Sequence, residues 1–237
     1  MELRTITLDA HSQKGVGRAS NQDAIGTLCW TSDQGKPDTI RSTMTQNDNP
    51  HLFLLADGVG GHEYGAIASR QTIETIVHQF SGDAENFNIA AGINAAHTTL
   101  NLKPTISHRQ MATTIVGLVL SRNTALIFNI GDSRAYALGN KELKLLSIDD
   151  VDETKPKNVI TQCIGGGKKL PKPHFLRYQN TLSETFILLS DGVTDYLTED
   201  KIFDIISSVA TNKSLLICSE AIRAGSDDDV SAMIITR

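Results

Sequence analysis

Apolar residues along this chain recur with two different periods, one typical of strands and one typical of helices. Near the start, Ile6 and Leu8 alternate with threonines, which predicts a strand. Further apolar or alternating runs predict buried strands, because few polar residues interrupt them. These strands are expected at residues 52–56, 114–120, 126–130, 186–189 and 233–235.

Helices are indicated where apolar residues recur with the spacing i, i+3, i+4 and i+7. Such stripes lie at residues 73–80, 89–100 and 202–209. Thr198 is placed to cap the last helix, whose stripe ends at Val209. Runs of strands interrupted by pairs of helices favour a layered α+β fold over a repeat of βαβ units. Polar stretches predict loops at residues 31–50, 149–158 and 165–173.

Size and composition narrow the class of protein. The chain has 237 residues, of which 40% are apolar, and these values fit one large globular domain. Its net charge is −5 and no basic block stands out, so we expect neither nucleic acid nor a membrane surface as a partner. Three widely spaced cysteines argue against a disulfide framework or a zinc site and favour a reducing compartment. With no signal-peptide pattern, we expect a cytoplasmic protein.

Aspartates beside glycines follow several of the predicted strands. The pairs are Asp57-Gly58, Gly131-Asp132 and Asp191-Gly192. Two further acidic positions are Asp23, near the start, and the run 227–229, just before the last strand. A single Asp-Gly pair after a strand is typical of a turn, but the repetition in one chain favours a shared site.

Carboxylates that meet in one site need a counter-charge. Two of them about 4 Å apart repel by roughly 4 kcal/mol at an effective dielectric constant near 20. They therefore cannot all stay ionised without bound protons or cations. Ligands that are oxygens, with no cysteine and little histidine, favour Mg²⁺ or Mn²⁺ over zinc.

Longer motifs surround these aspartates in a fixed order. They are Gly17–Asp23, Ala56–His62, Ala112–Thr114, Asn129–Tyr136, Thr161–Gly166, Leu189–Asp195 and Asp228–Ser231. In this order they resemble the metal-dependent protein phosphatase family, type 2C, in its compact bacterial form. The resemblance implies one domain over residues 1–237, in which two antiparallel β-sheets pack face to face between pairs of α-helices, a four-layer αββα arrangement.

The resemblance also implies a binuclear site for two divalent cations, Mn²⁺ or Mg²⁺. Asp57 would bridge the two ions, and the Gly58 carbonyl would help to hold one of them, directly or through water. Asp191 and Asp228 would complete the centre, and Asp23 would support it, mostly through bound water.

Three other residues receive roles from the same resemblance. Asp132, together with Asp191, matches the place where bacterial members hold a third, weaker metal. Arg18 would bind the substrate phosphate, because its planar guanidinium donates two parallel hydrogen bonds. His62 would either protonate the leaving oxygen or simply order the glycine-rich turn in which it lies.

The implied reaction is hydrolysis of phosphoserine and phosphothreonine on proteins by a metal-activated water, opposing a bacterial Ser/Thr kinase. We expect a monomer. Two alternatives stay open at this point. One is an inactive relative that binds phosphoproteins as a scaffold, and the other is an enzyme for small phosphoesters. The retention of Asp57, Asp191 and Arg18 favours an active enzyme.

Two features depart from the pattern of the family. Asp229 stands where relatives usually carry asparagine, and an added carboxylate there would strengthen metal binding or displace Asp228. The segment between Arg134 and Gln162 is short and lacks the His of the usual Thr-x-Asp-His motif, since Asp149-Asp150 stands there instead. In the family this segment shapes the choice of substrate.

Overall fold

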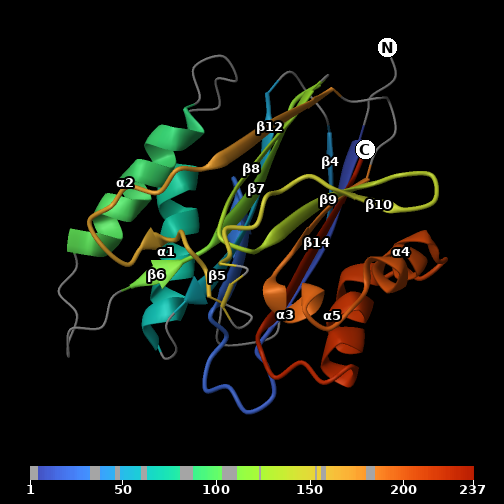
Figure 1. Cartoon of the computed structure of the whole chain (residues 1–237). Helices are drawn as coiled ribbons and strands as arrows, with labels where there is room; N and C mark the ends of the chain where they lie inside the picture. Colours follow the sequence, from blue (N-terminus) through green and yellow to red (C-terminus); the bar gives the residue numbers. More distant parts are fainter. Residues whose placement is uncertain are drawn as a thin grey trace.

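Two antiparallel sheets packed face to face form the centre of the molecule (Figure 1). The computed structural model describes residues 5–32, 38–45, 49–59, 63–80, 88–102, 111–122, 124–152, 154–155, 159–179 and 185–237. On one side, α1 (Glu63–Gln79) and α2 (Ile89–Leu102) cover the first sheet. On the other side lie α3 (Asp191–Thr194), α4 (Glu199–Ser207) and α5 (Lys213–Arg223). Among the described residues, no helix is long and apolar enough to cross a membrane.

The sheet beneath α1 and α2 is built around a long central strand. Its hydrogen-bonded order is β11 (Ile164–Gly165), β6 (Ala112–Thr113), β5 (His51–Val59), β7 (Ile115–Leu120), β8 (Thr124–Ile130) and β12 (His174–Gln179). In addition, β2 (Asp23–Thr27) pairs with β5, and β3 (Trp30–Thr31) pairs with β2. We call this the first sheet.

The second sheet lies beneath α4 and α5. Its order is β10 (Leu143–Leu145), β9 (Arg134–Leu138), β13 (Thr185–Leu189), β14 (Val230–Thr236), β1 (Thr5–Gln13) and β4 (Asp38–Thr45). The connection from β8 to β9 therefore leads from the first sheet to the second.

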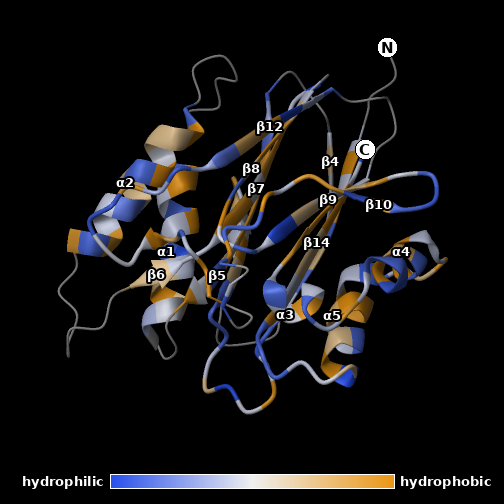
Figure 2. Cartoon of the chain, in the orientation of Figure 1, coloured by the Kyte–Doolittle hydropathy of each residue, from blue (hydrophilic) through white to orange (hydrophobic). Residues whose placement is uncertain are grey.

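Buried apolar side chains fill three layers. Between the sheets, Phe53 and Leu55 of β5 pack in one cluster with Leu188 and Met233 of the second sheet. A second cluster lies under α1 and α2, and a third lies under α4 and α5. Central strands are thus buried on both faces, which is why they are continuous apolar runs in the sequence. Figure 2 shows this concentration of hydrophobic residues on the central strands.

The α+β sandwich expected from the sequence is confirmed, and so are its main strands and helices. Each of the predicted strands lies within or overlaps an observed one. Thr198 is the N-cap of α4, and its side chain accepts a hydrogen bond from the Lys201 backbone N–H. The extent of the domain over residues 1–237 stays a prediction.

Two predictions of the sequence analysis were wrong in part. Residues 31–50 were expected to be a loop, but β4 lies within them and pairs with β1 at the edge of the second sheet. Only Ile40 and Met44 of this edge strand pack on the core, so its apolar signal is weak. The last predicted helix ends at Ser207, and Val209 is fully exposed rather than part of a buried stripe.

Gly117 in β7 shows how tightly the first sheet is packed. It lies opposite Phe128 of β8, and a Cβ added to Gly117 would lie 2.2 Å from the ring. Gly92 of α2 differs, because an added Cβ would make an ordinary contact at 3.7 Å with Ile76.

These two glycines therefore give opposite predictions for urea unfolding. Gly117→Ala is expected to lower the free energy of unfolding by about 1–3 kcal/mol, because the aromatic ring must move. Gly92→Ala is expected to raise it by about 0.5–1 kcal/mol, because alanine is the better helix former. Adding Phe128→Leu to Gly117→Ala should restore part of the loss. Equal effects of the two alanine variants would contradict the packing described here.

Candidate metal centre

Asp23 and Asp57 face each other across the β2–β5 pair of the first sheet, where they are register partners. The backbone of Asp57 is held firmly. Its carbonyl accepts hydrogen bonds from the Thr114 N–H at 2.8 Å and the Thr113 hydroxyl at 2.7 Å. Its N–H donates to Thr114 Oγ1 at 3.1 Å. The threonine motif of the sequence thus fixes the position of Asp57.

Asp191 and Asp228 lie next to strands of the second sheet. Asp191 is the first residue of α3, two residues after the end of β13, and Asp228 lies two residues before β14. Glycines allow the chain to approach closely here. A Cβ on Gly192 would lie 2.0 Å from the Asp229 carbonyl oxygen, and one on Gly15 would lie 2.3 Å from that of Asp228. The turn that carries Asp228 is therefore packed between two glycines.

The pKa values of these carboxyl groups show that they share one site. Burial raises the pKa of Asp57 well above its usual range, and the charges of Asp191 and Asp23 raise it further. Burial also raises the pKa of Asp23, followed by the charge of Asp229, while the Ser231 hydroxyl acts in the opposite direction. Burial raises the pKa of Asp191, although a hydrogen bond with Asp57 opposes the shift.

Asp132, after β8, belongs to the same electrostatic group. Its pKa is raised to about 7, first by burial and then by the charge of Asp191. Its turn is linked to that of Asp57, because Thr114 Oγ1 lies 2.8 Å from the Ser133 hydroxyl. The turn between β8 and β9, which joins the two sheets, thus brings Asp132 to the site.

The donor set fits divalent cations that prefer oxygen. The clustered groups are carboxylates, and Asp191 Oδ1 is a buried oxygen that accepts no hydrogen bond from the described part of the chain. No three His, Cys, Asp or Glu side chains among the described residues already have the arrangement of ligands around one ion. In this structure Asp228 Oδ1 instead pairs with Arg18 Nη2 at 2.5 Å.

Arg18 lies on the loop between β1 and β2, about one-third exposed. Asp229 holds both ends of this loop, because its Oδ1 accepts the Gly15 N–H and its Oδ2 accepts the Gln22 N–H, each at 2.8 Å. The departure from asparagine at this position thus has a structural reason. A carboxylate accepts from both backbone groups, whereas an amide offers only one acceptor oxygen.

The structure brings together all of the predicted carboxylates, Asp23, Asp57, Asp132, Asp191 and Asp228, and places Arg18 beside Asp228. Gly58 follows Asp57 in β5, and its N–H donates to the Gln22 carbonyl at 3.1 Å. His62 lies outside the described residues. The clamp made by Asp229 was not predicted, since nothing local to residue 229 indicates contact with residues 15 and 22.

Comparison with known proteins gives an independent result. The family described as protein phosphatase 2C matches residues 20–215. The chain is 25% identical over 223 residues to serine/threonine phosphatase stp of Listeria monocytogenes, covering 80% of this chain and 86% of that protein. It is 25% identical over 250 residues to serine/threonine protein phosphatase PstP of Mycobacterium tuberculosis, covering 95% of this chain and 44% of that one.

Solved structures show the same fold. The serine/threonine phosphatase of S. agalactiae superposes with a TM-score of 0.80 at 21% identity, covering 97% of this chain and 98% of that one. The catalytic domain of PstP in complex with two manganese ions superposes with a TM-score of 0.72 at 22% identity, covering 98% of each chain.

Asp229→Asn tests the clamp on the Arg18 loop. The variant keeps the size of the side chain but turns an NH₂ group toward one of the two backbone donors. A buried donor left unsatisfied costs about 1–3 kcal/mol, so the free energy of unfolding in urea with chelator should fall by about that amount. Asp227→Asn, at an exposed neighbour, is the matched control and should stay within about 0.5 kcal/mol of the native value. Equal stability of the two variants would disprove the clamp.

The raised pKa of Asp132 predicts a pH dependence of stability. Its pKa is about 7 in the folded chain against an ordinary value of 3.8, so between these values the folded state binds more protons than the unfolded state. Stability in chelator must then fall as pH rises through this window, by up to about 1.4 kcal/mol per pH unit. Asp132→Asn should flatten the decline in urea titrations between about pH 4 and pH 7. Parallel curves would show that Asp132 titrates normally.

Proposed function

Because this chain belongs to the protein phosphatase 2C family, we propose that it hydrolyses phosphoserine and phosphothreonine on proteins with water activated at a centre of two divalent cations. The main support is the set of buried carboxylates, in which Asp23 and Asp57 of the first sheet meet Asp191 of the second. A related structure, the catalytic domain of PstP, contains two manganese ions, which supports a binuclear centre here.

The residues divide into ligands and supports. Asp57, assisted by the Gly58 carbonyl, would bridge the two cations, and Asp191 and Asp228 would each complete the coordination. Asp23, opposite Asp57 in the β2–β5 register, would hold water of the centre. When bound, two divalent cations lower the pKa of water and neutralise charge on phosphate oxygens. No nucleophile from the protein is then required.

Arg18 would orient the substrate phosphate. Its guanidinium is partly exposed and already lies 2.5 Å from a carboxylate oxygen, Asp228 Oδ1. A phosphate has two oxygens that can accept hydrogen bonds from the same planar guanidinium. A substrate phosphate therefore competes with Asp228 for Arg18. If Arg18 moved from Asp228 to the phosphate, the Asp228 carboxylate would be free to bind the cations. The hydrogen bonds of Asp229 to Gly15 and Gln22 would hold the Arg18 loop in place during this exchange.

Finer features stay predictions. They are Mn²⁺ against Mg²⁺, a third and weaker ion at Asp132 and Asp191, and the role of His62 as general acid. The opposing Ser/Thr kinase, the monomeric state and the cytoplasmic location belong with them. An inactive scaffold is not favoured, because the relatives are Ser/Thr phosphatases and the carboxylate set is complete.

Hydrolysis of a phosphothreonine peptide with added Mn²⁺ tests the function directly. Asp57→Asn should lower the rate by more than about 100-fold, because a ligand contributes at least as much as its supporting contacts. Chelator should abolish the rate. Asp204→Asn, an exposed position on α4, is the matched control and should keep native activity.

Two results would contradict the proposal. A folded protein that binds Mn²⁺ but leaves the peptide intact is not a protein phosphatase. Hydrolysis of p-nitrophenyl phosphate without hydrolysis of any phosphopeptide would instead indicate an enzyme for small phosphoesters.

A further inference from the structure

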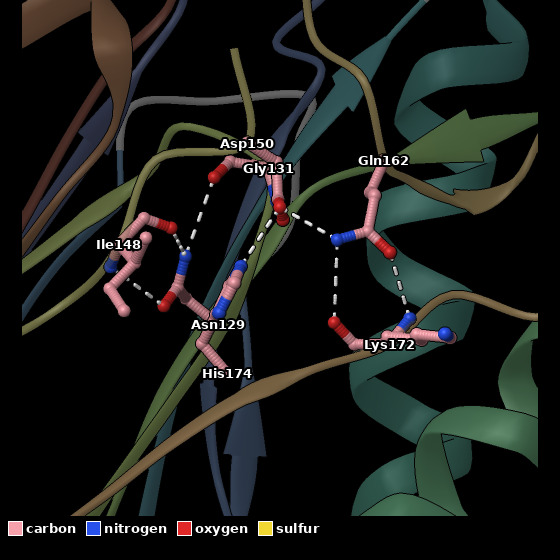
Figure 3. Close-up of polar contacts among 7 residues, drawn as sticks. All are labelled: Asn129, Gly131, Ile148, Asp150, Gln162, Lys172 and His174. Carbon is pink, nitrogen blue, oxygen red and sulfur yellow. Dashed lines mark hydrogen bonds and ion pairs between the residues drawn. The ribbon is translucent and has the colours of Figure 1, made fainter.

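Asp150 is a buried carboxylate that lies next to the turn preceding Asp132 (Figure 3). Its Oδ2 accepts a hydrogen bond from the Gly131 N–H at 2.9 Å. Its own N–H donates to the Gly131 carbonyl oxygen at 3.0 Å. Both backbone groups of Gly131 are therefore held by one residue, and the peptide that carries Asp132 follows directly.

The other oxygen of Asp150 points to later parts of the chain. Oδ1 accepts from Gln162 Nε2 at 2.7 Å and lies 2.9 Å from His174 Nε2. A carboxylate oxygen only accepts, so His174 donates from Nε2. Gln162 is itself held, because its Oε1 accepts the Lys172 N–H at 2.9 Å. Asp150 thus joins the β8–β9 turn to the segment 159–174, which we call the flap segment.

The contact with Asp150 leaves the turn little freedom. Gly131 has a φ of +94°, and a Cβ there would lie 2.6 Å from Thr114 Cγ2. Two residues before Gly131, Asn129 binds Ile148 at two points. Its Nδ2 donates to the Ile148 carbonyl at 2.6 Å, and its Oδ1 accepts the Ile148 N–H at 3.2 Å. The position of Asp132 therefore depends on the residues around Asp150.

A histidine from a later strand joins this network. Asp150, rather than a histidine, directly follows Asp149 in the sequence, and an imidazole reaches Asp150 from His174 in β12. Three donors surround the buried carboxylate, namely a backbone N–H, an amide and an imidazole. Burial of a charged group is tolerated when such donors replace water.

We propose that Asp150 is a positioning residue, which couples the flap segment to Asp132 and so sets the affinity of the weakest divalent-cation site, a role that depends on the metal centre proposed above. Asp150 touches no substrate itself. It acts by holding the Gly131 peptide from one side while Gln162 and His174 hold its carboxylate from the other. Changes in the flap segment therefore change the position of Asp132.

Two measurements on the full chain test this role. The first is hydrogen exchange of the Gly131 amide by NMR in chelator, and the second is Mn²⁺ binding by titration calorimetry. Asp150→Asn should speed exchange of the Gly131 amide about tenfold or more, as expected for one lost hydrogen bond. It should weaken the weakest Mn²⁺ site by about 10–100-fold, the usual effect of a supporting contact. Asp152→Asn, whose side chain contacts Thr154 and Lys155 instead, is the control and should change neither.

His174 supplies a second pair of variants if Asp150→Asn does not fold. His174→Ala should weaken the same Mn²⁺ site, and His174→Gln, which keeps an N–H donor, should restore it. Faster Gly131 exchange with an unchanged Mn²⁺ isotherm would overturn the coupling, and so would unchanged exchange in Asp150→Asn. The native protein separates the two proposals. Absence of Mn²⁺ binding by the native protein would refute the metal centre, whereas exchange at Gly131 reports on the turn alone.

Discussion

Mutual repulsion among buried carboxylates is the constraint on which this site depends. Strand pairing sets Asp23 opposite Asp57, and Thr113 and Thr114 bind the Asp57 backbone, so the two carboxylates cannot move apart. Burial then makes each ionised group more costly, and the pKa values of Asp57 and Asp23 rise. Because the fold fixes these negative charges close together, binding of protons or cations is favoured. Oxygen ligands favour divalent cations. Arg18 provides part of the balance by pairing with Asp228.

Much of the fold and of the site could be predicted from the sequence, because both depend on local patterns. Buried strands such as β5 and β7 are continuous apolar runs, and glycines mark the turns beside Asp57 and Asp191. The β4 strand was missed because an edge strand buries few side chains. Contacts between distant residues were also missed. Asp229 binds Gly15 across 214 positions, and no periodicity or spacing indicates such a partner.

Departures from the family pattern are explained by hydrogen bonding rather than by charge alone. Asp229 accepts two backbone N–H groups, which an asparagine in the same place does not satisfy. Asp150 accepts hydrogen bonds from three donors, one of which, His174, lies 24 residues further along the chain. In both cases a carboxylate beside the site serves as an acceptor that orders the backbone.

The origin of the clustered carboxylates next to two different sheets has a consequence for the chain as a whole. Asp23 and Asp57 belong to the first sheet, whereas Asp191 and Asp228 lie next to strands of the second. In that second sheet β1 and β14 pair although they lie at opposite ends of the described sequence. A fragment that ends after β9 would lack Asp191 and Asp228, and one that begins there would lack Asp23, Asp57 and Asp132. The five carboxylates therefore come together only when both sheets have formed and docked, and a partly folded chain presents an incomplete set.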